Sequence, residues 1–330
     1  MDDESLTARA ADAASRPLFI VGCPRSGTTL LRNLLRSHPH LTIPPETHFI
    51  PRFYRAYGDP ANEAEALALA SRILKLDRMV RIKGELQPRD FKDCRTYRHV
   101  VERLLGGFAR RQGKRRWADK TPPYLEELPT LVRIFPDAQF LHLIRDGRDV
   151  AMSWVESGFD PGNLFIAATL WNRQIRRCRA DATLLPPGAY FEIRYEQLLA
   201  NPEATLRAVC RFADEPYSPD ILNITRFADD GRTNARSQID GSNVEKWRDR
   251  MSRSDQALFE SRAGGLLGEL GYPVMGLRRR ISATEVAWWN VHHGVIKGLR
   301  HAAWSMDPAR ARTGYENTVA RFKAWRARRS

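Results

Sequence analysis

The sequence predicts an α/β fold in which a parallel sheet is flanked by helices on both faces. Short apolar runs at residues 17–22, 140–144 and 190–193 have the length and composition of buried strands. A segment with helical spacing or a helix-start signal follows each run. Buried strands that alternate with helices are typical of parallel sheets covered on both sides.

Length and composition agree with a globular protein that has a sizeable core. The chain has 330 residues, of which 42% are apolar and 28% charged. These values exclude a small disulfide scaffold and argue against a largely disordered chain. The four cysteines are far apart and show no CxxC spacing, so we expect neither a zinc site nor a disulfide framework, and a reducing compartment fits.

The first strand leads through a loop into a helix predicted over residues 28–37. The loop sequence Gly-Cys-Pro-Arg-Ser-Gly-Thr-Thr has the G-x-x-x-x-G spacing of a nucleotide P-loop, with Thr28 where the phosphate-binding lysine normally stands. Two glycines allow a tight turn in which backbone N–H groups and the helix N-terminus face an anion. The alternative is a structural turn without a ligand. The candidate anion-binding residues are Gly22, Pro24, Arg25, Ser26, Gly27, Thr28 and Thr29.

The elements that follow extend this P-loop-type sheet. Residues 50–113 are mostly helical in pattern, with the best candidate helix at 61–76, and form either a cap facing the substrate or an ordinary helical layer. Residues 114–120 offer a further strand. Helices are expected from about residue 149 and about residue 202. The composition changes after residue 273, so we divide the chain into a flexible N-terminus at 1–16, a P-loop domain at 17–275 and an extension at 276–330.

Two motifs resemble those of sulfotransferases that use 3′-phosphoadenosine 5′-phosphosulfate (PAPS). Residues 22–31, GCPRSGTTLL, resemble the 5′-phosphosulfate loop of that family, and residues 141–153, LHLIRDGRDVAMS, resemble its 3′-phosphate element. The resemblance implies a PAPS-dependent sulfotransferase in which Arg145 and Ser153 bind the 3′-phosphate. The alternative for Arg145 and Arg148 is a surface salt bridge with a neighbouring aspartate.

Within that family the chain is most similar to the tyrosylprotein sulfotransferase group. The similarity covers roughly residues 17–273 and includes the local patterns at 38–39, 45–47 and 50–52. It implies that Glu46 is the catalytic base and that Lys120 belongs to the active site. It further implies that Tyr195, Ser237 and Lys246 belong to the cofactor site, with Trp247 beside Lys246. His48 stands where the tyrosine enzymes have an arginine, so the acceptor stays open.

The expected chemistry is in-line sulfuryl transfer with a loose transition state, by analogy with phosphoryl transfer. Arg25 and Lys120 would stabilise charge on the bridging oxygen and the sulfonate. Glu46 would take the acceptor proton as general base. Two alternatives are that Glu46 caps a helix starting near Thr47 and that His48 is the base. We expect no metal in this reaction.

Several acceptors suit a carboxylate base: a small phenol, a glycan, a lipid hydroxyl or a peptidyl tyrosine. A P-loop kinase is the alternative enzyme, although it would lack its lysine. A basic adaptor for membranes or nucleic acid is the alternative binding module, but we find no motif of a nucleic-acid module and expect no such partner.

The C-terminal extension carries most of the net charge. Residues 276–330 hold twelve Arg or Lys and three acidic residues, which is +9 of the total of +14. A capping box at Ser282–Glu285 begins a predicted helix at 282–304 that places Trp288, Val291, Val295, Leu299 and Ala302 on one face. This face either touches a membrane surface or docks on the protein itself or on another copy. The acidic N-terminus is not a secretory signal, so we expect a cytoplasmic protein, with peripheral membrane association as one option.

Overall fold

The computed structural model describes residues 16–157, 161–224, 239–276 and 279–305. The chain divides into two compact units. Unit 1 comprises residues 1–144 and 178–242, and unit 2 comprises residues 145–177 and 243–330. The domain boundaries at residues 16 and 275 stay predictions.

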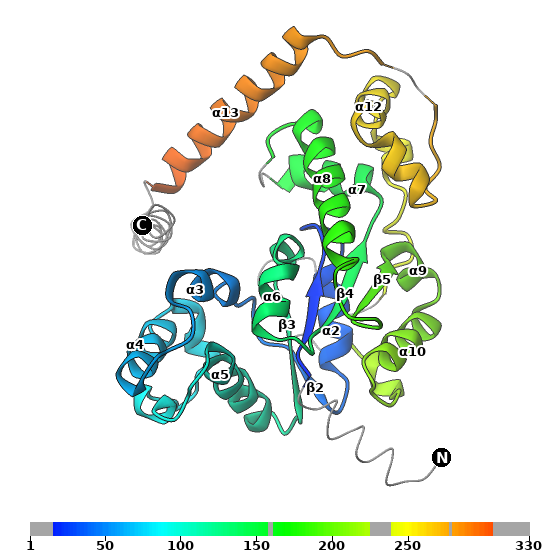
Figure 1. Cartoon of the computed structure of the whole chain (residues 1–330). Coiled ribbons are helices and arrows are strands. Elements are labelled where there is room, and N and C mark those ends of the chain that lie inside the picture. The colour runs from blue at the N-terminus through cyan, green and yellow to red at the C-terminus, as the bar shows by residue number, and fades with distance from the viewer. Residues whose placement is uncertain (1–15, 158–160, 225–238, 277–278, 306–330) are drawn as a thin grey trace. The chain divides into compact units, whose positions relative to one another are not determined.

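In the described residues, unit 1 contains a five-stranded parallel sheet (Figure 1). The strand order is β2-β3-β1-β4-β5. All strands except the two-residue β2 were predicted from the sequence, and the fold class is confirmed. The strands are β1 (Leu18–Val21), β2 (Leu41–Thr42), β3 (Arg116–Lys120), β4 (Gln139–Ile144) and β5 (Tyr190–Arg194).

Helices cover both faces of this sheet. Helix α2 (Thr28–Arg36) contacts β1, β2 and β3. The connection from β1 to β2 crosses the sheet in the opposite direction from the connection between β3 and β4. Because such crossovers are right-handed, α2 and α6 (Leu128–Ile134) lie on opposite faces. All four residues of β1 are fully buried between the two layers.

The strand register explains where the functional loops meet. Ile20 pairs with Lys120 on one side and with Leu141 on the other. Ile144, the last residue of β4, pairs with Arg194, the last residue of β5. The loop after β1, the end of β3 and the start of α9 (Tyr195–Ala200) therefore lie at the same carboxyl edge of the sheet, the edge at which open α/β sheets bind ligands.

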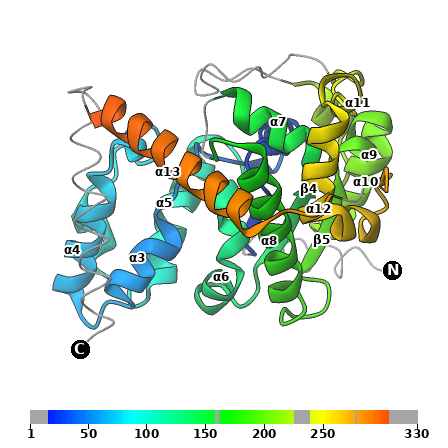
Figure 2. The same ribbon diagram turned by 90° about the horizontal axis from the view of Figure 1, so that it is seen from above.

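Residues 50–113 form the helical insertion expected from the sequence. Two views show α3, α4 and α5 side by side (Figure 1, Figure 2). Rings of Tyr54 and Tyr97 join α3 to α5, with their centroids 5.5 Å apart. The elements are α3 (Ile50–Tyr57), α4 (Glu63–Leu74), η1 (Asp77–Arg81), η2 (Pro88–Phe91) and α5 (Tyr97–Arg111). After α5 and β3 come η3 (Pro122–Glu126) and α6, and the last elements of unit 1 are α10 (Pro202–Phe212) and η4 (Pro219–Leu222).

Unit 2 is helical in its described residues. Helix α7 packs against α11 and α12. Gly147 at the start of α7 lies so close to Trp171 of α8 that a Cβ atom there would be 2.4 Å from the indole. The helices are α7 (Gly147–Ser157), the first part of α8 (Leu164–Ala182), α11 (Trp247–Arg250), α12 (Arg253–Glu269) and α13 (Ala283–Ser305).

Helix α13 begins at the predicted capping box, in which the Glu285 amide donates to Ser282 Oγ and the Ser282 amide donates to the Glu285 carboxylate. Its docked face differs from the predicted one. Trp289 packs on the Phe165–Leu258 cluster of unit 2, and its carbonyl accepts a hydrogen bond from Asn163. Among the residues with described side chains, the predicted stripe of Trp288, Val291 and Val295 is exposed. Contact of this stripe with a membrane or a second copy stays a prediction.

Within the described ranges, no helix has both the length and the apolar character that a membrane crossing requires.

Candidate functional site

The loop between β1 and α2 in unit 1 is shaped by its two glycines. A Cβ atom on Gly22 would lie 2.5 Å from the Leu143 carbonyl oxygen. Gly27 has a φ of +91°, and a Cβ there would lie 2.3 Å from the ring of Tyr195. Neither position therefore accepts a side chain without displacement of its surroundings. The predicted cofactor-side residue Tyr195 is thus brought directly onto the loop.

The end of this loop presents hydrogen-bond donors at the start of a helix. Gly27 is the N-cap of α2, and as a glycine it offers no side chain to cap the helix. The first N–H groups of the helix lack intrahelical partners and carry a partial positive charge. The Ser26 hydroxyl is buried and has no hydrogen-bond partner among the described residues. Together these groups fit an anion such as a phosphosulfate.

The backbone of the loop turns sharply at Arg25. Its φ is +72°, which is uncommon for a residue with a side chain, and the residue is exposed. The Ser26 amide donates to the Cys23 carbonyl at 3.1 Å, which closes the turn. Thr28 and Thr29 follow as the first residues of α2. The structure therefore brings the seven predicted loop residues together around one helix terminus.

Glu46 and Lys120, which were predicted separately as base and cation, form an ion pair in the structure. The Lys120 ammonium donates to Glu46 Oε1, and His48 Nε2 lies 2.8 Å from Glu46 Oε2. Lys120 is buried, whereas the side chains of Glu46 and His48 are about one-third exposed. The first described residue of α3 is Ile50, so the alternative that Glu46 caps a helix near Thr47 is wrong.

Two opposing effects act on the Glu46 carboxylate. Burial raises its pKa, but hydrogen bonds from His48 and Lys120, together with the Lys120 charge, outweigh burial and lower the pKa to about 2. Glu46 is therefore ionised at neutral pH in this state. Burial also lowers the pKa of Lys120, and the Arg32 guanidinium adds to this lowering, while Glu46 opposes it.

Thr47 anchors the segment that carries Glu46. Its amide donates to Thr121 Oγ1 at 3.1 Å, and its hydroxyl lies 3.0 Å from the Tyr124 hydroxyl. Tyr124 also accepts from the Ile50 amide. Arg78 of η1 donates to the Glu46 carbonyl at 3.3 Å. With Thr47 buried, the flanking side chains of Glu46 and His48 meet each other on the more exposed side.

Two charged residues near this pair were not predicted from the sequence. Arg32 is buried on α2, close enough to affect the Lys120 ammonium. The sequence feature that could have identified Arg32 is a positive charge between the apolar positions Leu31 and Leu34. Asp119 precedes Lys120 in β3 and is completely buried, and burial raises its pKa to about 6 despite the nearby Thr47 and Thr121 hydroxyls. The sequence feature that could have identified Asp119 is an aspartate inside a predicted buried strand.

Unit 2 holds residues 145–153 of the second predicted motif, which follow the end of β4. Arg145 is buried, donates to the Asn243 carbonyl at 3.0 Å and lies 3.3 Å from the Asp149 carboxylate. Asp149 in turn accepts from the Trp247 amide at 2.9 Å. This network holds Arg145 next to the segment that contains Lys246.

Both arginines pair with a neighbouring aspartate, as the alternative for this motif expected, but the pairs are buried and do not lie on the surface. Arg148 pairs with Asp146 at 2.7 Å, lies 3.5 Å from Glu260 and stacks over Trp247. These contacts give Arg148 a structural role. Ser153 lies on α7. The predicted Ser237 falls outside the described residues.

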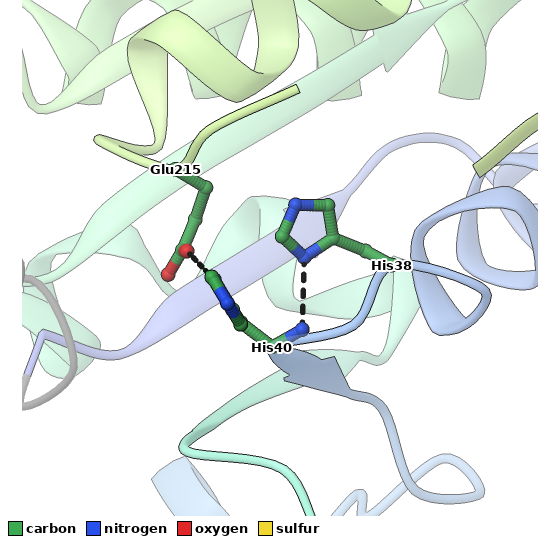
Figure 3. Close-up of side chains that lie close together, drawn as sticks. All are labelled: His38, His40 and Glu215. Atoms are coloured by element: carbon green, nitrogen blue, oxygen red, sulfur yellow. Dashed lines mark hydrogen bonds and ion pairs between the residues drawn. The ribbon is translucent and has the colours of Figure 1, made fainter. Parts of the chain in front are cut away.

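One group in the described part of the chain has the composition of a metal site. His38, His40 and Glu215 each offer a ligand atom within 4.8 Å of the others (Figure 3). However, the nitrogens of His38 are engaged, Nε2 with the Pro216 carbonyl at 2.7 Å and Nδ1 with the His40 amide at 3.1 Å. Arg115 also pairs with Glu215 at 2.8 Å. The positive charge of Arg115 opposes metal binding. We therefore interpret the group as a set of structural contacts between the segment that leads into β2 and residues 215–216.

Known proteins place these motifs in a family. The chain matches the sequence model of the Sulfotransferase family over residues 17–219. It is 27% identical over 221 residues to a protein-tyrosine sulfotransferase of Drosophila melanogaster, which covers 64% of this chain and 40% of that protein. It is 25% identical over 360 residues to the nodulation protein NoeE of Sinorhizobium fredii, which covers 94% and 82% of the two chains.

Solved structures agree at the level of the fold. A sulfotransferase domain of a Synechococcus olefin synthase is 24% identical, with a TM-score of 0.60 over 78% of this chain and 95% of that domain. A sulfotransferase domain of the curacin biosynthetic pathway is also 24% identical, with a TM-score of 0.58 over 78% and 98% of the two chains. The chain spans about half the length of the protein-tyrosine sulfotransferases it matches. The family model covers more than half of the sequence, and the chain therefore belongs to the sulfotransferase family.

Proposed function

We propose that this protein transfers a sulfuryl group from PAPS to an acceptor hydroxyl. The observation that carries the proposal is that a helix N-terminus with glycine as its N-cap and a Lys120–Glu46 pair lie at one sheet edge of unit 1. The helix terminus suits the anionic donor, and the pair supplies a cation and a base. Family membership supports the reaction type.

The residues of unit 1 fit the 5′-phosphosulfate. The buried Ser26 hydroxyl and the first amides of α2 would bind its oxygens, and Gly22 and Gly27 would let the ligand approach the backbone. In unit 2, Arg145 and Ser153 would bind the 3′-phosphate, as the family resemblance implies. Charge-assisted bonds from an arginine suit a group that carries nearly two negative charges. Lys246 is a further candidate for that phosphate.

Lys120 has two roles in this proposal. Before the donor binds, its ammonium neutralises Glu46. When the sulfonate arrives, Lys120 turns to the sulfonate and the bridging oxygen, where negative charge develops in the transition state. Arg25 assists from the loop. The departure of Lys120 removes one cause of the low pKa of Glu46, so the carboxylate becomes a stronger base at the moment when it is needed.

Glu46 then accepts the proton of the acceptor hydroxyl as its oxygen attacks sulfur and the bond from sulfur to the bridging phosphate oxygen breaks. The products are the sulfated acceptor and 3′-phosphoadenosine 5′-phosphate (PAP). This scheme uses only side chains and backbone amides and needs no metal. The acceptor is a phenol, a glycan, a lipid hydroxyl or a peptidyl tyrosine, and the relatives named protein-tyrosine sulfotransferases make a peptidyl tyrosine the first to test.

Glu46→Gln tests the assignment of the base. With sulfur-labelled PAPS and a panel of the four acceptor classes, the substitution should lower kcat by about 10²- to 10⁴-fold, because a positioned base contributes that much. PAP affinity, measured by calorimetry, should change little. The control is Glu203→Gln, which alters an exposed carboxylate on α10 and should leave turnover unchanged. Near-normal turnover of Glu46→Gln would eliminate this role.

A further inference from the structure

His48 makes a specific contact with the carboxylate that the proposed reaction uses. Its Nε2 atom lies 2.8 Å from Glu46 Oε2, while Lys120 occupies Oε1. An ionised carboxylate only accepts hydrogen bonds, so Nε2 carries the hydrogen and donates it. The two oxygens of Glu46 are thus fixed by two different donors, one on each.

The two donors differ in exposure. The Lys120 side chain is 2% exposed, whereas the His48 side chain is 38% exposed. Lys120 is therefore the inner partner and His48 the partner on the solvent side. If Lys120 turns to the sulfuryl group during the reaction, the histidine is the side chain still bonded to the base.

The backbone shows that His48 is held in place by its surroundings. Its φ is +54°, in the left-handed region that side-chain-bearing residues rarely occupy. The preceding residue Thr47 is buried and bonded on both its amide and its hydroxyl, which fixes the chain direction at this point. Unfavourable backbone conformations kept by a rigid surrounding are concentrated at functional sites.

We propose that His48 is a positioning residue, which holds the Glu46 carboxylate in the orientation required to take the acceptor proton. This inference rests on the proposed function of Glu46. It differs from the alternative that His48 is itself the base: since Nε2 donates to Glu46, such a base would have to take the proton at Nδ1, whereas in this proposal Nδ1 takes no part. In this proposal the reaction requires residue 48 to supply a hydrogen-bond donor at the position of Nε2, and it does not require a ring that titrates.

Two substitutions separate these roles. His48→Gln keeps an N–H donor near the place of Nε2 without a titrating group, and His48→Phe keeps the ring size without a donor. Both introduce a residue that is equally unsuited to positive φ, so they are matched for backbone strain. Thermal melting of each variant checks that the fold is retained.

The first measurement is sulfuryl transfer under saturating donor. His48→Phe should lower kcat by about 10- to 100-fold with little change in the KM for PAPS, and His48→Gln should stay within about threefold of the wild type. Equal turnover of His48→Phe and the wild type would overturn the inference. Equal damage in both variants would also overturn it, because the titrating ring itself would then be required.

The second measurement does not depend on turnover. Carbon-13 NMR of the Glu46 carboxylate, assigned with Glu46→Gln, should show a higher pKa in His48→Phe than in the wild type, with His48→Gln close to the wild type. An unchanged pKa in His48→Phe would mean that the contact does not hold the carboxylate. A wild-type protein that transfers sulfate to no hydroxyl would instead overturn the proposed function, whatever the titration shows.

Discussion

The proposed anion-binding groups of the two units are of different kinds. In unit 1 the loop from Gly22 to Thr29 uses backbone amides, and its shape depends on positions that exclude a side chain. In unit 2 the corresponding group is the Arg145 guanidinium, which is held by Asp149 and the Asn243 carbonyl. Added side-chain atoms should damage the loop in unit 1, whereas loss of positive charge should damage the Arg145 site in unit 2. Substitutions should therefore damage the two sites in different ways.

Gly27→Ala should have the largest effect. The new methyl group would meet the Tyr195 ring at 2.3 Å, and φ at this residue is +91°. Backbone strain costs about 1–2 kcal/mol of stability, and relief of the clash displaces the loop amides that would bind the donor, so PAP affinity should fall at least about 100-fold. Calorimetric titration with PAP measures this loss.

Gly113→Ala is the matched control for that substitution. Gly113 also has a positive φ, +66°, but a Cβ atom there meets nothing within 4 Å. It precedes the amino end of β3, at the edge of the sheet opposite to the loop. This variant should lose some stability and keep its PAP affinity. Equal loss of affinity in both variants would show that the space around Gly27 is not what matters.

Arg145→Ala should have a smaller effect that depends on the ligand. A hydrogen bond to a charged group contributes about 1.5–3 kcal/mol, so affinity for PAP should fall about 10- to 100-fold. Affinity for adenosine 5′-phosphate, which lacks the 3′-phosphate, should change much less. Competition binding with the two nucleotides measures the ratio. Equal losses for both would contradict the assignment of Arg145 to the 3′-phosphate and remove the contrast between the units.

The backbone-built site was the easier one to predict from the sequence. Its glycine spacing is local, and three of the strands stand out as apolar runs, so the loop and most of the sheet follow from short stretches. The motif around Arg145 was found through its resemblance to the sulfotransferase family. Strand β2 was missed because it has two residues, too few for a periodic signal. Helix α9 was missed because Tyr195 follows β5 without an intervening turn.

The charged partners were harder to predict because they depend on tertiary contacts. Nothing local shows that Asp149 bonds the Trp247 amide, 98 residues away in the sequence. The two tryptophans of α13 give a similar lesson, since Trp288 and Trp289 are adjacent and differ by about 100° in direction around the helix. The periodic pattern predicted an apolar stripe through Trp288, but in the structure it is Trp289 that packs against Phe165 and Ile166.

Two buried aspartates, one in each unit, give the finest test of the contrast. Asp149 has hydrogen bonds to Arg145 and to the Trp247 amide, whereas Asp119 is fully buried with only the weaker help of nearby hydroxyls. Burial raises the pKa of both, to about 6 for Asp119. Stability from a group whose pKa is raised on folding is fully present below the pKa of the unfolded chain and is lost as the pH rises through the folded value.

Asp119→Asn should therefore stabilise the protein at high pH. Because the pKa rises from 3.8 to about 6, the free energy of unfolding should increase by up to about 3 kcal/mol at pH 8, and the gain should vanish below about pH 4. Asp149→Asn should be neutral or destabilising at pH 8, because it removes the charge that Arg145 faces in a buried pair. Urea unfolding of both variants at pH 4 and pH 8 measures these changes. If Asp149→Asn gained as much as Asp119→Asn, the ion pair with Arg145 would not be holding the unit 2 site together.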